Sequence, residues 1–432
     1  MKFLNKQFTQ ETLKLALPVM LTQVGQVSVN LFDNIIVGKL LGAKALAAVS
    51  LGNAMFFSIF IFGLGFSLAI PPLVSEAHSQ HDHNRINSIF RHGFVVNIIL
   101  AFVLMLLIFG IIPLMPYLNQ PKEILPDTIT FLSIVTLSII PFMIFQTMRE
   151  VSEGLSFTIG VTKATIFANI INVILNYVFI EHFKMGVAGS AWATFIARVA
   201  MMVFLYYVLI KEEKTRRYIK DFSLKIKDFT KEMFEKLIRL GFPTALQLFF
   251  EVTAFAGAAF ICGLISAKDI AAHQIALSMA SFTFNLCVGF SVASTVMIGR
   301  KLGEKDFVNL EKVGFNNLKI AFIFMLMCGL VFILGKDVLP TFFTKKEDIA
   351  VVELASQLMI IAALFQLSDG IQVTALGCLR GIQDVKIPSI LTFIAYWVIT
   401  IPLGYYLTVP MKMGAFGMWI ALGIGLTISA VL

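Results

Sequence analysis

Charged residues are scarce in this chain, and their scarcity excludes a soluble protein. Of the 432 residues only 14% are Asp, Glu, Lys or Arg, whereas 58% are hydrophobic. No soluble domain of this size can bury so much apolar surface. The apolar residues form continuous runs of about 20 residues without alternation, which fits membrane-spanning helices and excludes a transmembrane β-barrel. The sequence therefore predicts an all-α polytopic membrane protein.

Cysteine is also rare, and it follows no pattern. The four cysteines have no paired spacing and lie in or beside apolar runs, so we expect packing residues rather than disulfides or metal ligands. They are Cys262, Cys287, Cys328 and Cys378. Glu76 and three nearby histidines (His78, His81 and His83) lack a metal-site spacing, so we expect a solvated loop there. Because no phosphate loop, nucleophile–base pair or channel filter is visible, we expect neither an enzyme nor a cofactor.

What is abundant is apolar sequence, in twelve segments. Six precede and six follow a basic linker, so we expect an N-lobe at 1–210, a linker at 211–236 and a C-lobe at 237–432. The predicted spans lie near 13–38, 45–72, 90–115, 129–150, 160–181, 186–210, 237–265, 270–298, 313–335, 350–378, 386–408 and 413–432.

The linker carries most of the orientation signal. Ten Lys and Arg residues lie within 211–239. The positive-inside rule then places this connection in the cytoplasm, and the alternation of spans places both termini there too. We interpret these charges as an orienting segment rather than a binding patch.

The two halves of the sequence resemble each other at a nearly constant separation, slightly more than half the chain length. Such a duplication is typical of transporters. Because each half has an even number of spans, both halves enter the membrane from the same side, which predicts a pseudo-twofold axis along the membrane normal and a cleft between two lobes. The matching segments are Pro18 and Pro243, 43–48 and 267–272, and 184–189 and 412–417.

Two isolated acids mark the second half. Glu251 is the only ionisable residue besides Cys262 within 242–266. A carboxylate far from both ends of a span costs about 3 kcal/mol unless it faces water, a cation or a proton donor. The second acid, Asp369, lies in the tenth span. Two acids in one dry cavity repel each other, so the pair can bind one cation or take up a proton.

Polar side chains at helical spacing accompany these acids. In the second half they are Gln247, Gln274, Gln366 and Gln372, with Phe250 and Phe365 beside them. The many phenylalanines and methionines suit bulky cations, although most of them are expected to pack helices or face lipid.

The first half has one such acid. Asp33 shares a helical face with Gln23, Gln26 and Asn30. With Asn172, Asn176 and Thr194 it offers oxygen ligands and amide dipoles, which suit a hard cation or a protonated carboxylate. Interhelical hydrogen bonding would explain the asparagines but not the acid. Arg198, inside the sixth span, is expected to have a structural partner.

These residues resemble the multidrug and toxic compound extrusion (MATE) family, NorM-type branch, over essentially the whole chain. The resemblance is carried by GFPTALQLFFE ending at Glu251, by FQLSDGIQ containing Asp369, by LRG at 379–381, by Asp33 with Val37, Gly38 and Gly42, and by GVAGSAWAT ending at Thr194. It implies that Glu251 and Asp369 couple cations in the C-lobe, and that Asp33 is the N-lobe acid surrounded by Asn172, Asn176 and Thr194. Phe365 stands where some relatives have tyrosine, and Tyr396 is the phenol expected in its place.

The resemblance further implies an antiporter of the bacterial cytoplasmic membrane that exports amphipathic organic cations in exchange for Na⁺ or H⁺ by alternating access. A Na⁺ site at Glu251 and Asp369 and a proton site there both remain open. We expect a monomer whose partners are cationic drugs or dyes and the bilayer, with no nucleic acid.

The alternative is a lipid-linked oligosaccharide flippase, but that function predicts a basic cavity. A receptor or scaffold would not need three intramembrane acids.

Overall fold

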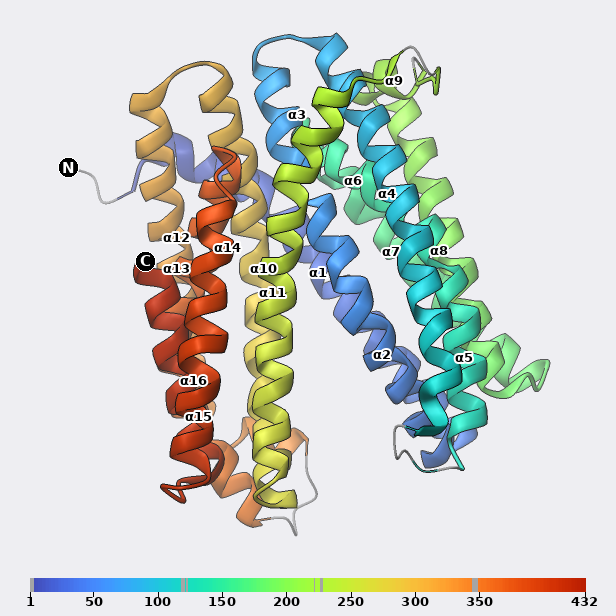
Figure 1. Cartoon of the computed structure of the whole chain (residues 1–432), viewed down its shortest axis with the longest axis vertical. Coiled ribbons are helices and arrows are strands. Elements are labelled where there is room, and N and C mark those ends of the chain that lie inside the picture. Colours follow the sequence, from blue (N-terminus) through green and yellow to red (C-terminus); the bar gives the residue numbers. More distant parts are fainter. Residues whose placement is uncertain (1–3, 118–120, 122, 221, 226–227, 344–348) are drawn as a thin grey trace. The chain divides into compact units, whose positions relative to one another are not determined.

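The computed structural model describes residues 4–117, 121, 123–220, 222–225, 228–343 and 349–432. These residues form helices and no strand (Figure 1). The α-helices are α1 (Lys6–Leu41), α2 (Ala43–Ser67), α3 (Ile70–Ser79), α4 (His83–Ile111), α5 (Leu125–Leu137), α6 (Ile139–Gly154), α7 (Ile159–Tyr177), α8 (Gly186–Lys211), α9 (Glu213–Lys220), α10 (Lys231–Gly263), α11 (Ala267–Gly303), α12 (Phe307–Gly335), α13 (Ile349–Gly381), α14 (Lys386–Phe393), α15 (Ile401–Thr408) and α16 (Gly414–Val431). Short 3₁₀ or π segments are η1 (Ile112–Tyr117), η2 (Val178–His182), η4 (Leu339–Phe342) and η5 (Ile394–Thr400).

The described helices confirm the all-α polytopic fold. Eleven helices are long and apolar enough to cross a membrane when consecutive segments such as α2 with α3, or α14 with η5 and α15, are taken together. Twelve spans result when the pair α5 and α6, bent by 42°, also counts as one. The helices extend beyond several predicted spans, and α11 is the longest at 37 residues. Its start is capped by Ser266, whose hydroxyl accepts a hydrogen bond from the backbone N–H of Asp269.

Contacts divide the chain into two compact units. One consists of Met1–Met20 with Leu246–Leu432, and the other of Leu21–Ala245. These units differ from the lobes at 1–210 and 237–432 that the sequence predicts. In the structure the start of α1 packs with the second half, and the start of α10 packs with the first. Each unit therefore receives the first turns of the other half's leading helix.

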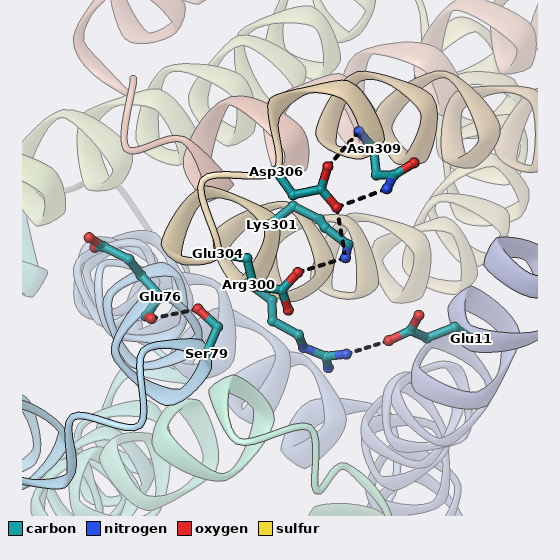
Figure 2. Close-up of polar contacts among 8 residues, drawn as sticks. All are labelled: Glu11, Glu76, Ser79, Arg300, Lys301, Glu304, Asp306 and Asn309. Atoms are coloured by element: carbon teal, nitrogen blue, oxygen red, sulfur yellow. Dashed lines mark hydrogen bonds and ion pairs between the residues drawn. The ribbon is translucent and has the colours of Figure 1, made fainter.

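Polar contacts hold the start of α1 within its unit. Glu11 pairs with Arg300 of α11 (Figure 2). One residue further on, the Thr12 hydroxyl donates to Asn317 Oδ1 of α12 at 2.6 Å. Further along α1, Ala16 and Met20 pack directly against Gly289 of α11, so closely that a Cβ on Gly289 would collide with them. Such individual polar contacts are not visible in a hydropathy pattern, so the sequence alone predicts a different boundary.

The duplication is visible in the turns between helices. All six non-glycine residues with positive φ in the described chain form pairs at nearly the separation of the sequence repeat, and two glycines form a fourth pair. Asp82 and Asp306, which directly follow one such pair of turns, cap the next helix in each half. Asp82 accepts a hydrogen bond from the backbone N–H of Arg85, and Asp306 accepts one from that of Asn309. The pairs are His81 with Lys305, Ser156 with Gln383, Lys184 with Lys412, and Gly186 with Gly414.

In the unit that contains most of the second half, α11 and α13 pack closely along their lengths (Figure 1). A Cβ on Gly377 would lie 2.4 Å from the backbone oxygen of Ser291, so only glycine permits this approach. Two hydroxyls then bond across the interface: Ser291 Oγ donates to the Val373 carbonyl at 2.6 Å, and Thr295 Oγ1 donates to the Gly377 carbonyl at 2.9 Å. These contacts fix the face of α13 that carries Asp369.

In the other unit, α4 and α8 pack against the bent pair α5 and α6, and α7 packs along α8. Buried apolar side chains such as Phe131, Leu132 and Val135 form its core. A Cβ on Gly25 would lie 3.0 Å from the Asn169 amide nitrogen, which itself donates to the Gly25 carbonyl at 2.9 Å. This close approach of α1 and α7 positions Asp33 of α1 beside the asparagines of α7.

Candidate functional sites: two buried acid clusters

The first cluster lies in the second half, between α10, α13 and η5. Glu251, Asp369 and Tyr396 are all buried there, with exposures of 7%, 5% and 0%. The Tyr396 hydroxyl lies 3.4 Å from Glu251 Oε1 and 3.2 Å from Gln372 Oε1. The structure therefore brings together the two acids, the phenol and one of the amides that the sequence singled out for the second half.

A π-helical segment positions the phenol. In η5 the Thr400 hydroxyl donates to the carbonyl of Ala395, five residues earlier, at 2.8 Å. Gly425 of α16 leaves room for this threonine, since a Cβ there would lie 1.7 Å from Thr400 Oγ1. Single π turns inside helices occur frequently at functional sites. Here the turn places Tyr396 in contact with Glu251.

The chemistry of this cluster is that of a cation or proton site. The Tyr396 hydroxyl has one proton but lies near two acceptors, so it cannot satisfy both. Asp369 lies within electrostatic range of Glu251, and neither acid forms an ion pair in the described chain. A positive ligand would relieve the repulsion between the two carboxylates. No group of three or more His, Cys, Asp or Glu suited to a metal occurs among the described residues, so such an ion would also rely on amide and phenol oxygens.

One basic residue lies at longer range from this cluster. Arg380, near the end of α13, is within electrostatic range of Glu251. Its guanidinium is held elsewhere, because it donates to the Ser291 hydroxyl at 2.8 Å and to the Leu376 carbonyl at 3.1 Å. Arg380 therefore offsets part of the negative charge of the pair without closing the site as an ion pair would.

Other predicted residues of the second half are dispersed around the cluster. Gln247 is buried on α10, whereas Gln274 on α11 is exposed. Gln366 donates to the Thr283 hydroxyl at 2.6 Å. Phe365 is buried and stacks on Trp419, with ring centroids 5.3 Å apart, so its ring packs in the unit interior. Phe250 contacts Phe393 at a centroid distance of 4.9 Å.

The second cluster lies in the first half, where α1 and α7 meet. Asn176 Nδ2 donates to Asp33 Oδ1 at 2.6 Å and lies 3.4 Å from Asn172 Oδ1. All three side chains are buried. Asn176 Oδ1, also buried, has no hydrogen-bond partner within the described residues. The structure thus places together three of the four residues that the sequence assigned to this site.

Thr194, Gln26 and Asn30, which the sequence also assigned to this site or its cavity, do not join the hydrogen bonds around Asp33. The Thr194 hydroxyl donates to the carbonyl of Ser190 in its own helix at 3.1 Å. Gln26 is half-buried, and Asn30, one turn before Asp33, is exposed. These three side chains therefore lie apart from the hydrogen bonds that join Asp33 to the asparagines, although all are on helices of the same unit.

Arg198 is the basic residue associated with this cluster. Its guanidinium donates to the Ser138 hydroxyl at 2.6 Å, at the bend between α5 and α6. It also lies over the rings of Phe56 and Phe142, at 4.8 and 5.1 Å from their centroids. Asp33 lies within its electrostatic range but forms no ion pair with it. The predicted structural partner of Arg198 is thus a hydroxyl and two aromatic faces, with the acid at longer range.

Sequence reasoning missed one buried charged group. Arg149 Nε donates to Glu153 Oε1 at 2.7 Å on α6, and the glutamate is 1% exposed. The sequence signal was available, because charged residues at 149, 150 and 153 end an apolar run.

The four cysteines are free, as expected of packing residues, and the histidines expected in a solvated loop lie mostly in helices, because His78 belongs to α3 and His83 begins α4. His83 belongs to no metal cluster among the described residues, and its Nδ1 lies 2.7 Å from the hydroxyl of Tyr218. Burial raises the pKa of Tyr218, which lies in α9 outside the spans, so its hydroxyl keeps the proton it shares with His83.

The fold and its two acid clusters define a duplicated, all-helical integral membrane protein. A family model named MatE matches residues 18–178 and 243–406, one segment in each half. The chain belongs to this family, the multidrug and toxic compound extrusion proteins, and to its NorM-type branch.

Named relatives support the assignment over nearly the full length. The multidrug resistance protein NorM of Photobacterium profundum is 31% identical over 433 residues, covering 98% of this chain and 94% of that protein. A probable NorM of Agrobacterium fabrum is 33% identical and covers 98% and 91%. The multidrug resistance protein MdtK of Pectobacterium atrosepticum is 31% identical and covers 99% and 95%.

Solved structures share the fold at lower sequence identity. The eukaryotic MATE transporter AtDTX14 has a TM-score of 0.89 at 17% identity, covering 98% of this chain and 94% of that one. A multidrug resistance MATE transporter in an outward-facing conformation has a TM-score of 0.88 at 20% identity, with the same coverage.

Proposed function

We propose that this protein is a secondary active antiporter that exports amphipathic organic cations in exchange for Na⁺ or H⁺ by alternating access. The observation that carries the proposal is the pair Glu251 and Asp369, buried without an ion pair in the described chain and accompanied by the Tyr396 phenol and the Gln372 amide. Buried acids of this kind are costly and are found where a cation or proton moves. The names of the bacterial relatives, which are multidrug resistance proteins, support the substrate class.

Competition for the same carboxylates would couple the two fluxes. An organic cation and the coupling ion each neutralise the pair, so binding of one disfavours the other, and each shifts the same conformational equilibrium. Moving one charge inward down a potential of 100 mV yields roughly 2.3 kcal/mol, which is available to drive export. The Asp33 cluster is a second acid of the same type, but Asn176 already donates to it.

The proposed setting is a monomer in the bacterial cytoplasmic membrane, with the basic linker and both termini on the cytoplasmic side. The ten positive charges of 211–239 support this orientation.

The charges near the acid clusters argue against the alternative function, a flippase. Each acid cluster has only one arginine within electrostatic range in the described chain, whereas a flippase for pyrophosphate-linked lipids would need several buried basic residues.

Transport in proteoliposomes tests the proposal. A fluorescent lipophilic cation is supplied at equal concentration inside and outside, and its efflux is measured first under an inward Na⁺ gradient and then under an inward proton gradient. We expect one of the gradients to drive efflux against the dye gradient, and the Glu251→Gln variant to show none. A dye that stays at equal concentration on both sides, whichever ion is supplied, would refute antiport.

A further inference from the structure

The leading helix of each half has, at its start, a hydrogen bond of the same kind from a backbone N–H to a side chain. The backbone N–H of Asn5, just before α1, donates to Asn316 Oδ1 at 2.9 Å. The backbone N–H of Thr230, just before α10, donates to His92 Nε2 at 2.8 Å. The separation of the two donors and that of the two acceptors both match the separation of the repeat. Each bond lies within a single compact unit.

The duplicated bond uses an amide in one half and an imidazole in the other. His92 Nδ1 lies 2.7 Å from the carbonyl oxygen of Ser88, which can only accept, so Nδ1 carries a proton. His92 Nε2 faces an N–H, so it must accept with its lone pair. The contacts therefore require neutral imidazole with the proton on Nδ1. A second proton would place two donors face to face at Thr230, whereas the Asn316 amide oxygen has no such protonation state.

The described residues around His92 offer little to compensate a positive charge. Its side chain has no exposed surface, and the rings of Phe229 and Phe234 contact it edge to face, with centroids 5.1 and 4.6 Å away. The nearby acid from the linker, Asp228, is already paired with Arg91 of α4 at 3.0 Å.

Some other charged groups near the start of α10 interact with one another. On α10 itself, Lys236 interacts with Glu76 of α3 and Arg85 of α4, and Glu76 also pairs with Arg85 at 2.7 Å. A proton on His92 would in addition place a positive charge at the positive end of the α10 dipole.

We propose that His92 is a positioning residue that clamps the start of α10 while its imidazole is neutral and releases it when the imidazole is protonated. The matching clamp on α1, through Asn316, does not respond to pH. α10 continues from this clamp to Glu251, so the device would couple the pH on the linker side of the membrane to the helix that carries one of the two buried acids. The clamp itself does not depend on the proposed antiport, and only its effect on transport does.

Hydrogen exchange measured at pH 7.5 and pH 5.5, on either side of the range in which histidine titrates, tests the clamp directly. In the full-length protein, after correction for intrinsic exchange, the Thr230 amide should lose about tenfold in protection at the lower pH, because a group that must stay neutral destabilises the closed state by up to tenfold per pH unit. The Asn5 amide should keep its protection at both values, which provides an internal control.

Two reciprocal variants separate a pH-sensitive clamp from a merely structural contact. His92→Asn should remove the pH dependence at Thr230, and Asn316→His should create one at Asn5. Because the second variant alters the other clamp, it remains informative even if His92→Asn loses protection at both pH values. Equal protection of Thr230 at both pH values in the unaltered protein, or no new pH dependence in Asn316→His, would overturn the proposal.

Discussion

The two halves of the chain keep the same turns but place different charges at corresponding positions. Aligning Pro18 with Pro243 places Glu251 opposite Gln26, and Asp33 opposite Ala258. Aligning Gly154 with Gly381 places Asp369 opposite Phe142. The positive-φ turns, in contrast, occur in matched pairs in the described chain, apart from Gly42.

This difference shows that the duplicated scaffold and the buried charges are under separate constraints. A turn with positive φ must recur for the helices to reverse direction in the same way. A buried acid must recur only where a ligand is bound, because it costs stability elsewhere. The second half sets two acids against one distant arginine, whereas in the first half Asp33 alone faces Asn176 and Arg198. The second half is therefore the better candidate for ion coupling.

Removing either acid of the second half should have the largest effect. Glu251→Gln and Asp369→Asn should each abolish gradient-driven dye efflux in proteoliposomes, because one carboxylate cannot attract both ligands as the pair does. A matched control adds Gln247→Glu to the Glu251→Gln variant, which returns a carboxylate to α10 one turn before its original position. If position matters as well as charge, this double variant should not recover efflux. Full efflux in both single variants would remove the second half from the coupling mechanism.

Asp369→Asn should raise stability more than Asp33→Asn does. Burial of the Asp33 carboxylate costs more than its attraction to Arg198 offsets, so its neutralisation should raise the free energy of unfolding in detergent only slightly. Asp369 is buried and is also repelled by Glu251, so both effects favour its neutralisation and the gain should be larger. A larger gain in Asp33→Asn than in Asp369→Asn would contradict the contrast between the halves.

Much of the fold could be predicted from the sequence, because long apolar runs and the repeat of Pro18 and Pro243 are properties of composition and spacing. The grouping of Glu251, Asp369 and Tyr396 also followed from the sequence, although Tyr396 rested on the resemblance to the family. The exchange of helix starts between the units could not be predicted, because it depends on individual bonds such as Thr12 to Asn317. The π turn of η5 was likewise hidden, since it requires the space left by Gly425.

Tyr396→Phe should have an intermediate effect. The variant removes a hydroxyl that lies 3.4 Å from Glu251 Oε1 and leaves the buried ring in place. Loss of one hydrogen bond to a charged group costs about 1.5–3 kcal/mol and destabilises the ion-free carboxylate, so a proton should bind roughly tenfold or more tightly. Na⁺ would instead lose a phenol ligand and should bind more weakly. The ion concentration that gives half-maximal efflux measures this change, and Tyr405→Phe, at an exposed tyrosine of α15, should leave it unaltered.

Asp306→Asn should have the smallest effect. Hydrogen bonds from Asn309, followed by the contact with Lys301, lower the pKa of Asp306 below its ordinary value of 3.8 (Figure 2). Because the folded-state pKa is lowered, the carboxylate contributes stability above the ordinary pKa, and this contribution is lost as pH falls through the lowered one. The unfolding midpoint of the variant should therefore lie slightly under that of the unaltered protein from about pH 4 upward, and match it only below the lowered pKa. A difference confined to acid pH would reverse the assigned sign.

The central claim is that the paired carboxylates of the second half hold either the organic cation or the coupling ion. Calorimetric titration of tetraphenylphosphonium into the detergent-solubilised protein, at a series of Na⁺ concentrations and pH values, tests it most directly. We predict that the apparent Kd rises tenfold for each tenfold increase in the competing ion, and that this dependence disappears in the Glu251→Gln, Asp369→Asn double variant. An affinity that stays constant across both series would contradict the claim.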